Sequence, residues 1–175
     1  MQKFTANHPF CKGIAIAKPF VIEPLEMKAR RSFCDDPESE VQKFHISVKQ
    51  GAEQISQLAD TGNLIFLSHL ELVNDHVFHN DVIQKILSEH KSAEWALEET
   101  VVNLVSEFAS LDYDYMRERA IDIKDVGMRI FSCLRKATHR PFEDIQESVI
   151  VVAKELTPSD TADMDFSHIK GFITE

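Results

Sequence analysis

The sequence predicts an α+β fold, in which an antiparallel bundle of about four helices is inserted into a small α/β subdomain. Runs rich in β-branched and aromatic residues lie near both ends of the chain, at 13–23, 148–153 and 169–174. Between these runs, apolar residues recur with helical spacing and the connections are short, which is typical of antiparallel helices. We therefore expect residues 1–30 and 142–175 to form the α/β subdomain and residues 31–141 the helical subdomain.

The first strand is expected within residues 13–23, where Pro19 indicates a kinked strand or a strand at a sheet edge. A helix should follow from Asp36 to about Asp60. The Asp36 carboxylate can accept hydrogen bonds from first-turn amides, and Pro37 has no N–H to lose. Five apolar residues then recur at helical spacing: Val41, Phe44, Val48, Ile55 and Leu58.

Three more helical stretches are predicted downstream of the first. One covers about 64–74, with 82–87 as its bent continuation. Ser92 is expected to cap a helix that ends near residue 111, and the last helix covers 115–137. Polar breaks between the stretches are expected in four places: 60–63, 80–81, 90–92 and 112–114.

The β pattern returns in the last part of the chain. Residues 148–153, SVIVVA, form a continuous apolar run, as expected of a strand buried on both faces. In the following segment Thr157 can cap a helical turn, Pro158 can take its first position, and Asp160 is the acid three residues after the cap. With 169–174 as the next strand, the sequence predicts a parallel β-α-β unit.

Composition and charge limit the kind of protein. Of 175 residues, 43% are apolar and 27% charged, as in soluble globular chains, and the net charge is −10. Nucleic acid is an unfavourable partner for such a chain, whereas a basic protein or a cation suits it. Cys11, Cys34 and Cys133 show no CxxC pairing, so neither a disulfide framework nor structural zinc is indicated. With no membrane-length apolar run and no signal peptide, we expect a cytoplasmic protein without membrane insertion.

The densest group of ionisable residues lies between residues 115 and 129. Four of them fall on one helical stripe: Glu118, Asp122, Asp125 and Arg129. Either this stripe is a solvated face with ordinary ion pairs, or it is a buried or docking polar seam. In the second case the neighbouring Arg119 suits a carboxylate or a phosphate.

Two further groups carry possible chemistry. A divalent metal would find ligands in His69, Asp75, His76 and His79, although no HExxH pattern is present; the alternative is half-buried histidines with satisfied hydrogen bonds. Thr157, Ser159, Asp160 and Thr161 follow a buried strand, where α/β sheets bind ligands. They form either a helix cap alone or a site for an anion or a reactive side chain, and capping leaves the Thr161 hydroxyl unexplained.

Five segments together resemble the N-terminal part of Enzyme I of the phosphoenolpyruvate-dependent sugar phosphotransferase system, a phosphoenolpyruvate-protein phosphotransferase. They are KGIAIAKPF, IFLSHLELVND, LDYDYMRERAIDIKDVGMRI, VIVVAKELTPSDTADMD and KGFITE, in the family's order and spacing from about Lys12 onward. The resemblance implies a helical domain inserted into a swivelling α/β phosphohistidine domain. This architecture agrees with the one predicted from the residues.

The resemblance also implies a chemistry. Enzyme I moves a phosphoryl group from phosphoenolpyruvate to its own histidine in a Thr-Ser-His segment, and then to a histidine phosphocarrier protein, a relay that drives sugar uptake. The chain ends before that segment, and none of its eight histidines matches. We therefore expect no catalytic residue and no activity in this chain, only Thr161 as the threonine that hydrogen-bonds the active histidine. Magnesium binding and dimerisation belong to the family's C-terminal domain, so no cofactor is expected here.

A docking surface for the phosphocarrier protein is implied on the helical domain, and the negative charge fits a partner with a basic rim. Its implied residues are His69, Leu72, Asp75, His76, Phe108, Tyr115, Met116 and Arg119. The chain departs from the family at His76 and Val77, where an acidic pair is usual, and near Asp60, where acids are fewer. The alternative hypothesis is a non-catalytic interaction module or a divergent paralogue that has lost the relay.

Overall fold

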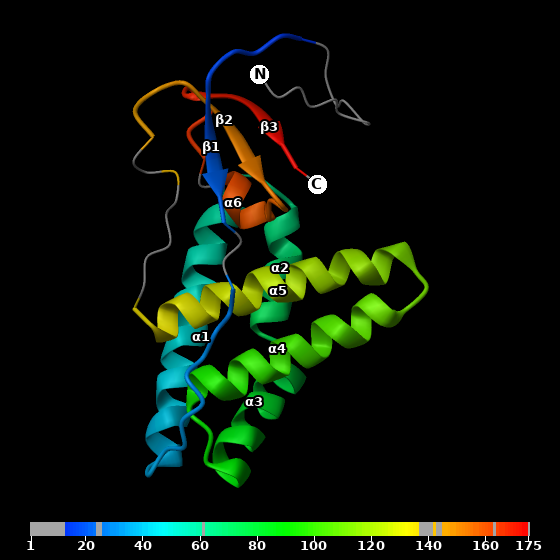
Figure 1. Cartoon of the computed structure of the whole chain (residues 1–175). Coiled ribbons are helices and arrows are strands. Elements are labelled where there is room, and N and C mark those ends of the chain that lie inside the picture. The colour runs from blue at the N-terminus through cyan, green and yellow to red at the C-terminus, as the bar shows by residue number, and fades with distance from the viewer. Residues whose placement is uncertain are drawn as a thin grey trace. The chain divides into compact units, whose positions relative to one another are not determined.

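A computed structural model of the chain describes residues 13–23, 26–60, 62–136, 142, 145–162 and 164–174 (Figure 1). Its elements are, in order, β1 (Lys18–Ile22), α1 (Pro37–Ala59), α2 (Ile65–Val73), α3 (His76–Glu89), α4 (Ala93–Ser110), α5 (Asp114–Leu134), β2 (Val149–Ala153), α6 (Pro158–Ala162) and β3 (Ile169–Ile173). The predicted α+β class is confirmed, with strands at both ends of the described chain and five long helices between them.

By its contacts the chain divides into two compact units. The sheet unit consists of the described residues of Met1–Pro24, Pro141–Glu155 and Met164–Glu175, and the helical unit of those of Leu25–Arg140 and Leu156–Asp163. The sequence interpretation places all of 142–175 in one subdomain. In the structure, the segment that carries α6 groups with the helices, although strands of the sheet unit flank it in the sequence.

The sheet unit contains a parallel sheet in the order β1-β2-β3. Lys18 lies opposite Val149, and Val149 opposite Ile169. The β2 strand is central, and its side chains alternate between buried and half-buried, which agrees with the continuous apolar run in its sequence. Pro19 lies in the edge strand β1, where a residue without an N–H disturbs the ladder least.

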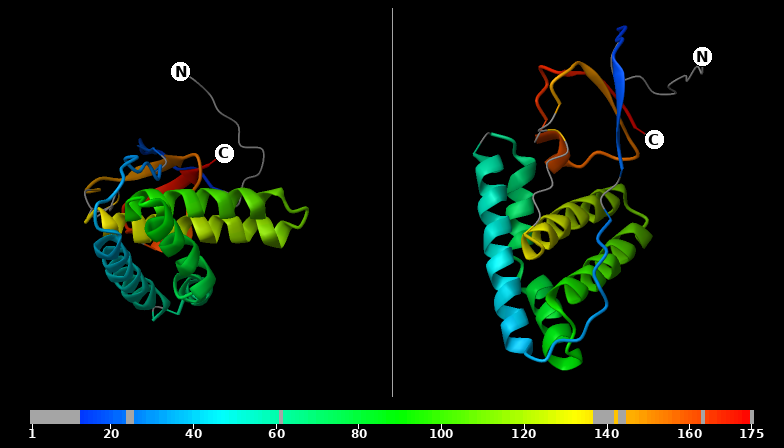
Figure 2. Two further views of the ribbon diagram at one scale, coloured as in Figure 1. Left: turned by 90° about the horizontal axis from the view of Figure 1, so that it is seen from below. Right: turned by 60° about the vertical axis from the view of Figure 1, so that its left-hand side comes forward.

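In the helical unit, α4 and α5 form an antiparallel hairpin, and α1 and α2 run side by side (Figures 1 and 2). Two predicted caps are present. The Asp36 carboxylate accepts a hydrogen bond from the Ser39 amide at 3.1 Å, and the Ser92 hydroxyl accepts one from the Trp95 amide at 3.4 Å. The starts of α1 and α4 are therefore determined locally by the sequence.

The expected break at residues 80–81 is wrong, and so is the bent continuation of the second helix. A separate helix, α3, runs through these positions from His76 to Glu89. The real break lies at Asn74 and Asp75, where the Asp75 carboxylate accepts a hydrogen bond from the Val77 amide at 2.8 Å and caps the new helix. Among the residues that the structure describes, the bundle therefore has five helices longer than two turns, where the sequence predicts about four.

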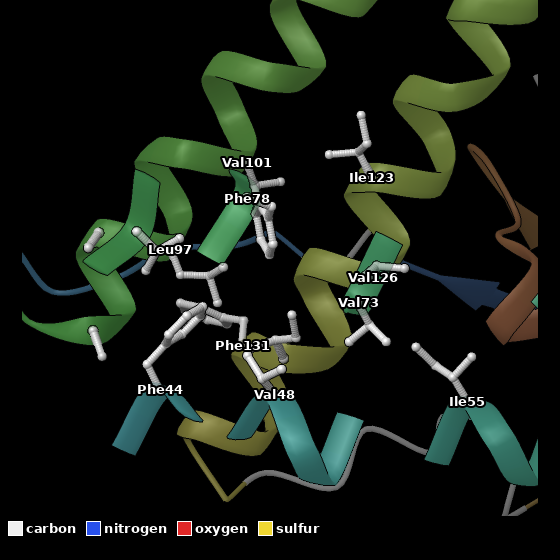
Figure 3. Close-up of a cluster of buried hydrophobic side chains, with 14 of the residues drawn as sticks. Phe44, Val48, Ile55, Val73, Phe78, Leu97, Val101, Ile123, Val126 and Phe131 are labelled. Atoms are coloured by element: carbon white, nitrogen blue, oxygen red, sulfur yellow. The ribbon is translucent and has the colours of Figure 1, made fainter. Parts of the chain in front are cut away.

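Buried apolar side chains from α1, α2, α3, α4 and α5 form one core (Figure 3). Its largest fully buried members are Phe44, Phe66, Ile55, Ile86, Leu97 and Ile130. Of the five apolar residues predicted for the inner face of α1, three are buried and the other two, Val41 and Leu58, pack half-buried against the core. The helical periodicity in the sequence therefore identifies the face that α1 buries.

The hairpin of α4 and α5 is closely packed at Gly127. A Cβ atom at this position would lie 2.5 Å from Cγ2 of Val101 and 3.3 Å from Cε of Met27. Val101 is buried and β-branched, so it has little room to move. The absence of a side chain at Gly127 is therefore what allows α5 to approach α4 this closely.

We predict that Gly127→Ala lowers the free energy of unfolding by about 1–3 kcal/mol, because the added methyl group overpacks the hairpin. Gly51→Ala is the matched control in α1, since its Cβ would lie 3.5 Å from Cγ1 of Ile130, an ordinary contact. There, alanine should stabilise the helix by up to about 1 kcal/mol. Urea unfolding followed by circular dichroism measures both. Equal midpoints for the two variants would contradict the prediction.

Candidate functional site

A pocket of about 100 Å³ opens on the helical unit among α2, α3, α4 and α5. Its lining residues are mostly apolar, with two carboxylates: Leu72, Asp75, Val77, Phe78, Asp81, Leu104, Phe108, Ile123 and Val126. Phe78, Ile123 and Val126 are buried and form its floor, while both carboxylates are exposed. The pocket therefore combines an apolar floor with an acidic edge.

The short connection between α2 and α3 shapes one side of this pocket. The Asp75 amide donates to the Leu72 carbonyl at 3.1 Å, and the Asp75 side chain caps α3. Capping uses one carboxylate oxygen of a side chain that is exposed, so the charge remains accessible. Asp75 thus caps α3 and also places a negative charge at the edge of the pocket.

Three of the residues that the resemblance assigns to docking line the pocket, namely Leu72, Asp75 and Phe108. Tyr115 and Met116 lie in the first turn of α5, with Tyr115 58% exposed and Met116 half-buried. His76 is exposed at the start of α3. The structure therefore brings three of the eight together in one concave site.

His69 is placed differently from the expectation. Its ring is only 1% exposed, so in this conformation it cannot itself contact a docked protein. Nε2 lies 3.1 Å from Oδ1 of Asp122, and Nδ1 lies 3.8 Å from Oδ2 of Asp125. The buried imidazole therefore sits between two carboxylates of α5 and ties α2 to that helix.

Arg119 extends this polar group toward the surface. Its Nε donates to the Tyr115 hydroxyl at 3.1 Å, its guanidinium lies 5.4 Å from the centre of the Tyr115 ring, and its Nη1 lies 3.6 Å from Oδ2 of Asp122. A cation over an aromatic face is attracted by the ring quadrupole. Tyr115, Arg119, Asp122 and His69 therefore form a continuous chain from an exposed side chain to a buried one.

Asp125 is the most deeply buried carboxylate of the stripe, at 6% exposed. Its Oδ2 accepts a hydrogen bond from the Ser159 amide at 3.2 Å, and Arg129 Nη2 donates to the Ser159 hydroxyl at 2.8 Å. Burial raises the pKa of the Asp125 carboxyl, opposed by the hydrogen bonds from Ser159 and by the charges of His69 and Arg129.

The stripe on α5 is therefore a polar seam over most of its length and not a solvated face. Asp122, Asp125 and Arg129 are each buried or half-buried and each contacts another helix or its neighbour Arg119. Glu118 alone is exposed, as the solvated alternative expects. Both sequence hypotheses thus hold for part of the stripe.

The capping box predicted for α6 is present. The Asp160 amide donates to the Thr157 hydroxyl at 3.2 Å, and the Thr157 amide donates to the Asp160 carboxylate at 2.9 Å. Thr161 donates its hydroxyl hydrogen to the Pro158 carbonyl at 2.9 Å. A hydroxyl oxygen keeps two lone pairs when it donates, so Thr161 retains the capacity to accept a hydrogen bond.

In the histidine group considered as a metal site, the centres of the His76 and His79 rings lie 6.3 Å apart, but members of the group have partners elsewhere. His79 Nε2 is bonded to the Val73 carbonyl at 2.8 Å, Asp75 caps α3, and His69 faces α5. In the part of the chain that the structure describes, no three His, Cys, Asp or Glu side chains form a group suited to a metal ion. The metal-binding hypothesis therefore gains no support from the geometry.

Two lining residues, Phe78 and Asp81, escape the sequence analysis, which names Val77 only as a departure from the family. The expected break at residues 80–81 hides them, because it divides the helix that carries both. Val77 and Asp81 are four residues apart and fall on one side of α3. The Asp75 cap signal would have revealed that helix. Ser159 as a partner of Asp125 has no signal in the sequence, since 34 residues separate the two.

None of the helices in the described part of the chain combines the length and apolar character that a membrane span requires.

Comparison with known proteins gives consistent matches. The family profile described as PEP-utilising enzyme, N-terminal, matches residues 8–119, and the profile described as PEP-utilising enzyme, mobile domain, matches residues 145–175. Phosphoenolpyruvate-protein phosphotransferases of Bacillus sp. (strain S) and Listeria monocytogenes are 35% and 37% identical over 171 residues. The match covers 93% of this chain, which spans 30% of the length of each relative.

Solved structures agree with these sequence matches. A solution structure of an Enzyme I protein superposes with a TM-score of 0.72 at 30% identity, covering 90% of this chain and 68% of that one. The structure described as the N-terminal domain of Enzyme 1 - Nitrogen superposes with a TM-score of 0.65 at 22% identity, covering 93% of this chain and 70% of that one. At this low identity, the second match shows a similar fold only.

The raised pKa of Asp125 predicts a pH dependence of stability. With a folded-state pKa above the unfolded value, the native state binds the proton more tightly, so stability falls as pH rises through the folded pKa. Wild type should therefore lose stability relative to Asp125→Asn between acid and neutral pH. Urea midpoints from pH 4.5 to 7.5 measure the difference. Glu118→Gln, an exposed carboxylate on the same helix, is the control, and parallel curves for wild type and Asp125→Asn would contradict the prediction.

Proposed function

Because the chain belongs to the family of PEP-utilising enzymes, as their N-terminal region, we propose that its helical unit docks a histidine phosphocarrier protein. The docking serves a phosphoryl relay that starts from phosphoenolpyruvate and drives sugar uptake. The relatives are phosphoenolpyruvate-protein phosphotransferases, and the proposal gives the same activity to the protein to which this region belongs. In the proposal, the region recognises the phosphoryl acceptor protein.

The pocket among α2, α3, α4 and α5 is the observation that carries this proposal. Interfaces are typically built from an apolar centre with a polar rim. The buried Phe78, Ile123 and Val126 supply the centre, and the exposed Asp75 and Asp81 supply rim charge. A small protein with an apolar patch inside a basic rim would therefore complement the apolar centre and the acidic rim of this site.

Tyr115 and Arg119 add an anchor outside the pocket lining. Tyrosine and arginine are over-represented among the residues that dominate binding energy. Here the Arg119 guanidinium is held by the Tyr115 hydroxyl and by Asp122, so little rotamer freedom is lost on docking. The proposal assigns both residues to direct contact with the partner.

His76 and Val77 change the character of the rim. Val77 lines the pocket and is 70% exposed, at a place where the family usually has acids. An apolar residue there enlarges the apolar contact and removes charge that would steer a basic partner. Association should therefore depend less on salt than a fully acidic rim would require.

Thr161 would contribute to the relay itself. Its hydroxyl oxygen can accept a further hydrogen bond, which suits a threonine that orients a reacting imidazole. The His69 ring is buried between two carboxylates, so it cannot be the imidazole that reacts in the relay. Docking and the orientation of the relay histidine are thus assigned to different residues of this region.

We predict that Phe108→Ala weakens binding of the histidine phosphocarrier protein by about tenfold or more, since it removes an aromatic wall of the pocket. Val102→Ala is the control on the same helix, because Val102 is 55% exposed and does not line the pocket. Calorimetric titration of the purified chain measures both. No binding by the folded wild-type chain would contradict the proposal and favour an interaction module that has lost the relay.

We further predict that Asp75→Asn slows association by a few-fold at low salt while leaving the fold intact. Asparagine caps a helix about as well as aspartate, so only the charge is lost. The salt dependence of the association rate should also become smaller. Stopped-flow measurements at two ionic strengths test this. Asp35→Asn, at an exposed position outside the pocket lining, serves as the control and should have a smaller effect.

A further inference from the structure

The α6 turn has an unusual attachment. In the sequence it lies between β2 and β3, yet its segment, Leu156–Asp163, groups with the helical unit. A five-residue helix has almost no core of its own: none of its residues is buried. Contacts made by its polar groups therefore contribute to its attachment to the helices.

The Ser159 amide is the first such contact. Thr157 caps the turn and Pro158 takes its first position, so Ser159 is the second residue of the helix. Amides of the first turn have no acceptor within their own helix. The Asp125 carboxylate accepts from this amide at 3.2 Å, so a side chain of α5 satisfies a backbone group of α6.

Arg129 supplies the second contact. Its Nη2 donates to the Ser159 hydroxyl at 2.8 Å, while its Nη1 donates to Oε1 of Gln54 in α1 at 3.2 Å. The planar guanidinium is thereby fixed from two sides. Asp125 and Arg129 lie four residues apart, on one side of α5, and both hold the same residue of the turn.

His69 lies beside the Asp125 carboxylate that accepts the hydrogen bond from Ser159. Its Nδ1 lies 3.8 Å from the Oδ2 atom of Asp125 that accepts the Ser159 amide. Its Nε2 is bonded to Asp122, which in turn contacts Arg119. The carboxylate that holds α6 is therefore part of the polar seam that reaches the proposed docking surface.

We propose that Asp125 and Arg129 are positioning residues that clamp the turn bearing Thr161 onto the helices of the docking pocket. Thr161 is then held by the helical unit, to which its segment belongs. The inference rests on the proposed function and deepens it, because the residue assigned to the relay histidine and the surface assigned to the phosphocarrier protein are held by one helix, α5.

Amide hydrogen exchange with water, followed by NMR on the free 175-residue chain, tests the clamp. In Asp125→Ala the Ser159 amide loses its acceptor, and both it and the Thr161 amide should exchange on the order of tenfold faster. Asp125→Asn keeps an acceptor oxygen and should restore exchange to within a few-fold of wild type. Ser159→Ala, which keeps the amide but loses the hydroxyl that Arg129 binds, should have an intermediate effect.

The amide of Ile130, a fully buried residue of α5, reports whether each variant remains folded. Unchanged exchange at Thr161 in Asp125→Ala, with Ile130 still protected, overturns the clamp. So does a failure of Asp125→Asn to rescue. These measurements use no partner. If exchange is unchanged in Asp125→Ala while the phosphocarrier protein still binds the chain, only the clamp has failed. If exchange changes as expected but the protein does not bind, only the docking proposal has failed.

Discussion

The burial of Asp125 is the constraint on which much of the helical unit depends. A carboxylate placed in an apolar interior is costly unless it is hydrogen-bonded or paired. Its partners come from different elements: Ser159 from α6, His69 from α2 and Arg129 from its own helix. The Ser159 amide lies 3.2 Å and His69 Nδ1 3.8 Å from the same oxygen, Oδ2. The carboxylate therefore specifies where α2 and α6 meet α5, a requirement that apolar packing alone imposes far less strictly.

The same helix supplies the floor of the pocket. Ile123 and Val126 each follow a seam residue, Asp122 and Asp125, by one position. Neighbouring positions on a helix point about 100° apart, so seam and floor are adjacent faces of α5. Gly127 follows Val126, and its lack of a side chain lets α5 pack closely on α4. The pocket floor, the polar seam and the contact with α4 thus lie within two turns of one helix.

Electrostatics has two distinct parts in this molecule. In the proposed docking, exposed Asp75 and Asp81 would act through water, on the approach of a charged partner, and their effect would be screened by salt. Half-buried Asp122 and buried Asp125 act over short distances, where water screens them less, and their effect is on position. The net charge of −10 follows from composition, but only the fold separates steering carboxylates from structural ones.

Local sequence determined the features that depend on neighbouring residues. Helix caps at Asp36 and Ser92, the capping box of α6 and the inner face of α1 all arise from contacts within a few residues, and a pattern of side chains is enough to predict them. The break at Asn74 and Asp75 is also local, because the Asp75 carboxylate caps α3. Tertiary structure decided the burial of His69 and the bond from Ser159 to Asp125. Both depend on what distant segments place beside a residue. A histidine next to apolar residues has the same sequence pattern whether it faces a partner or two carboxylates, and only the packing of α2 on α5 selects the second.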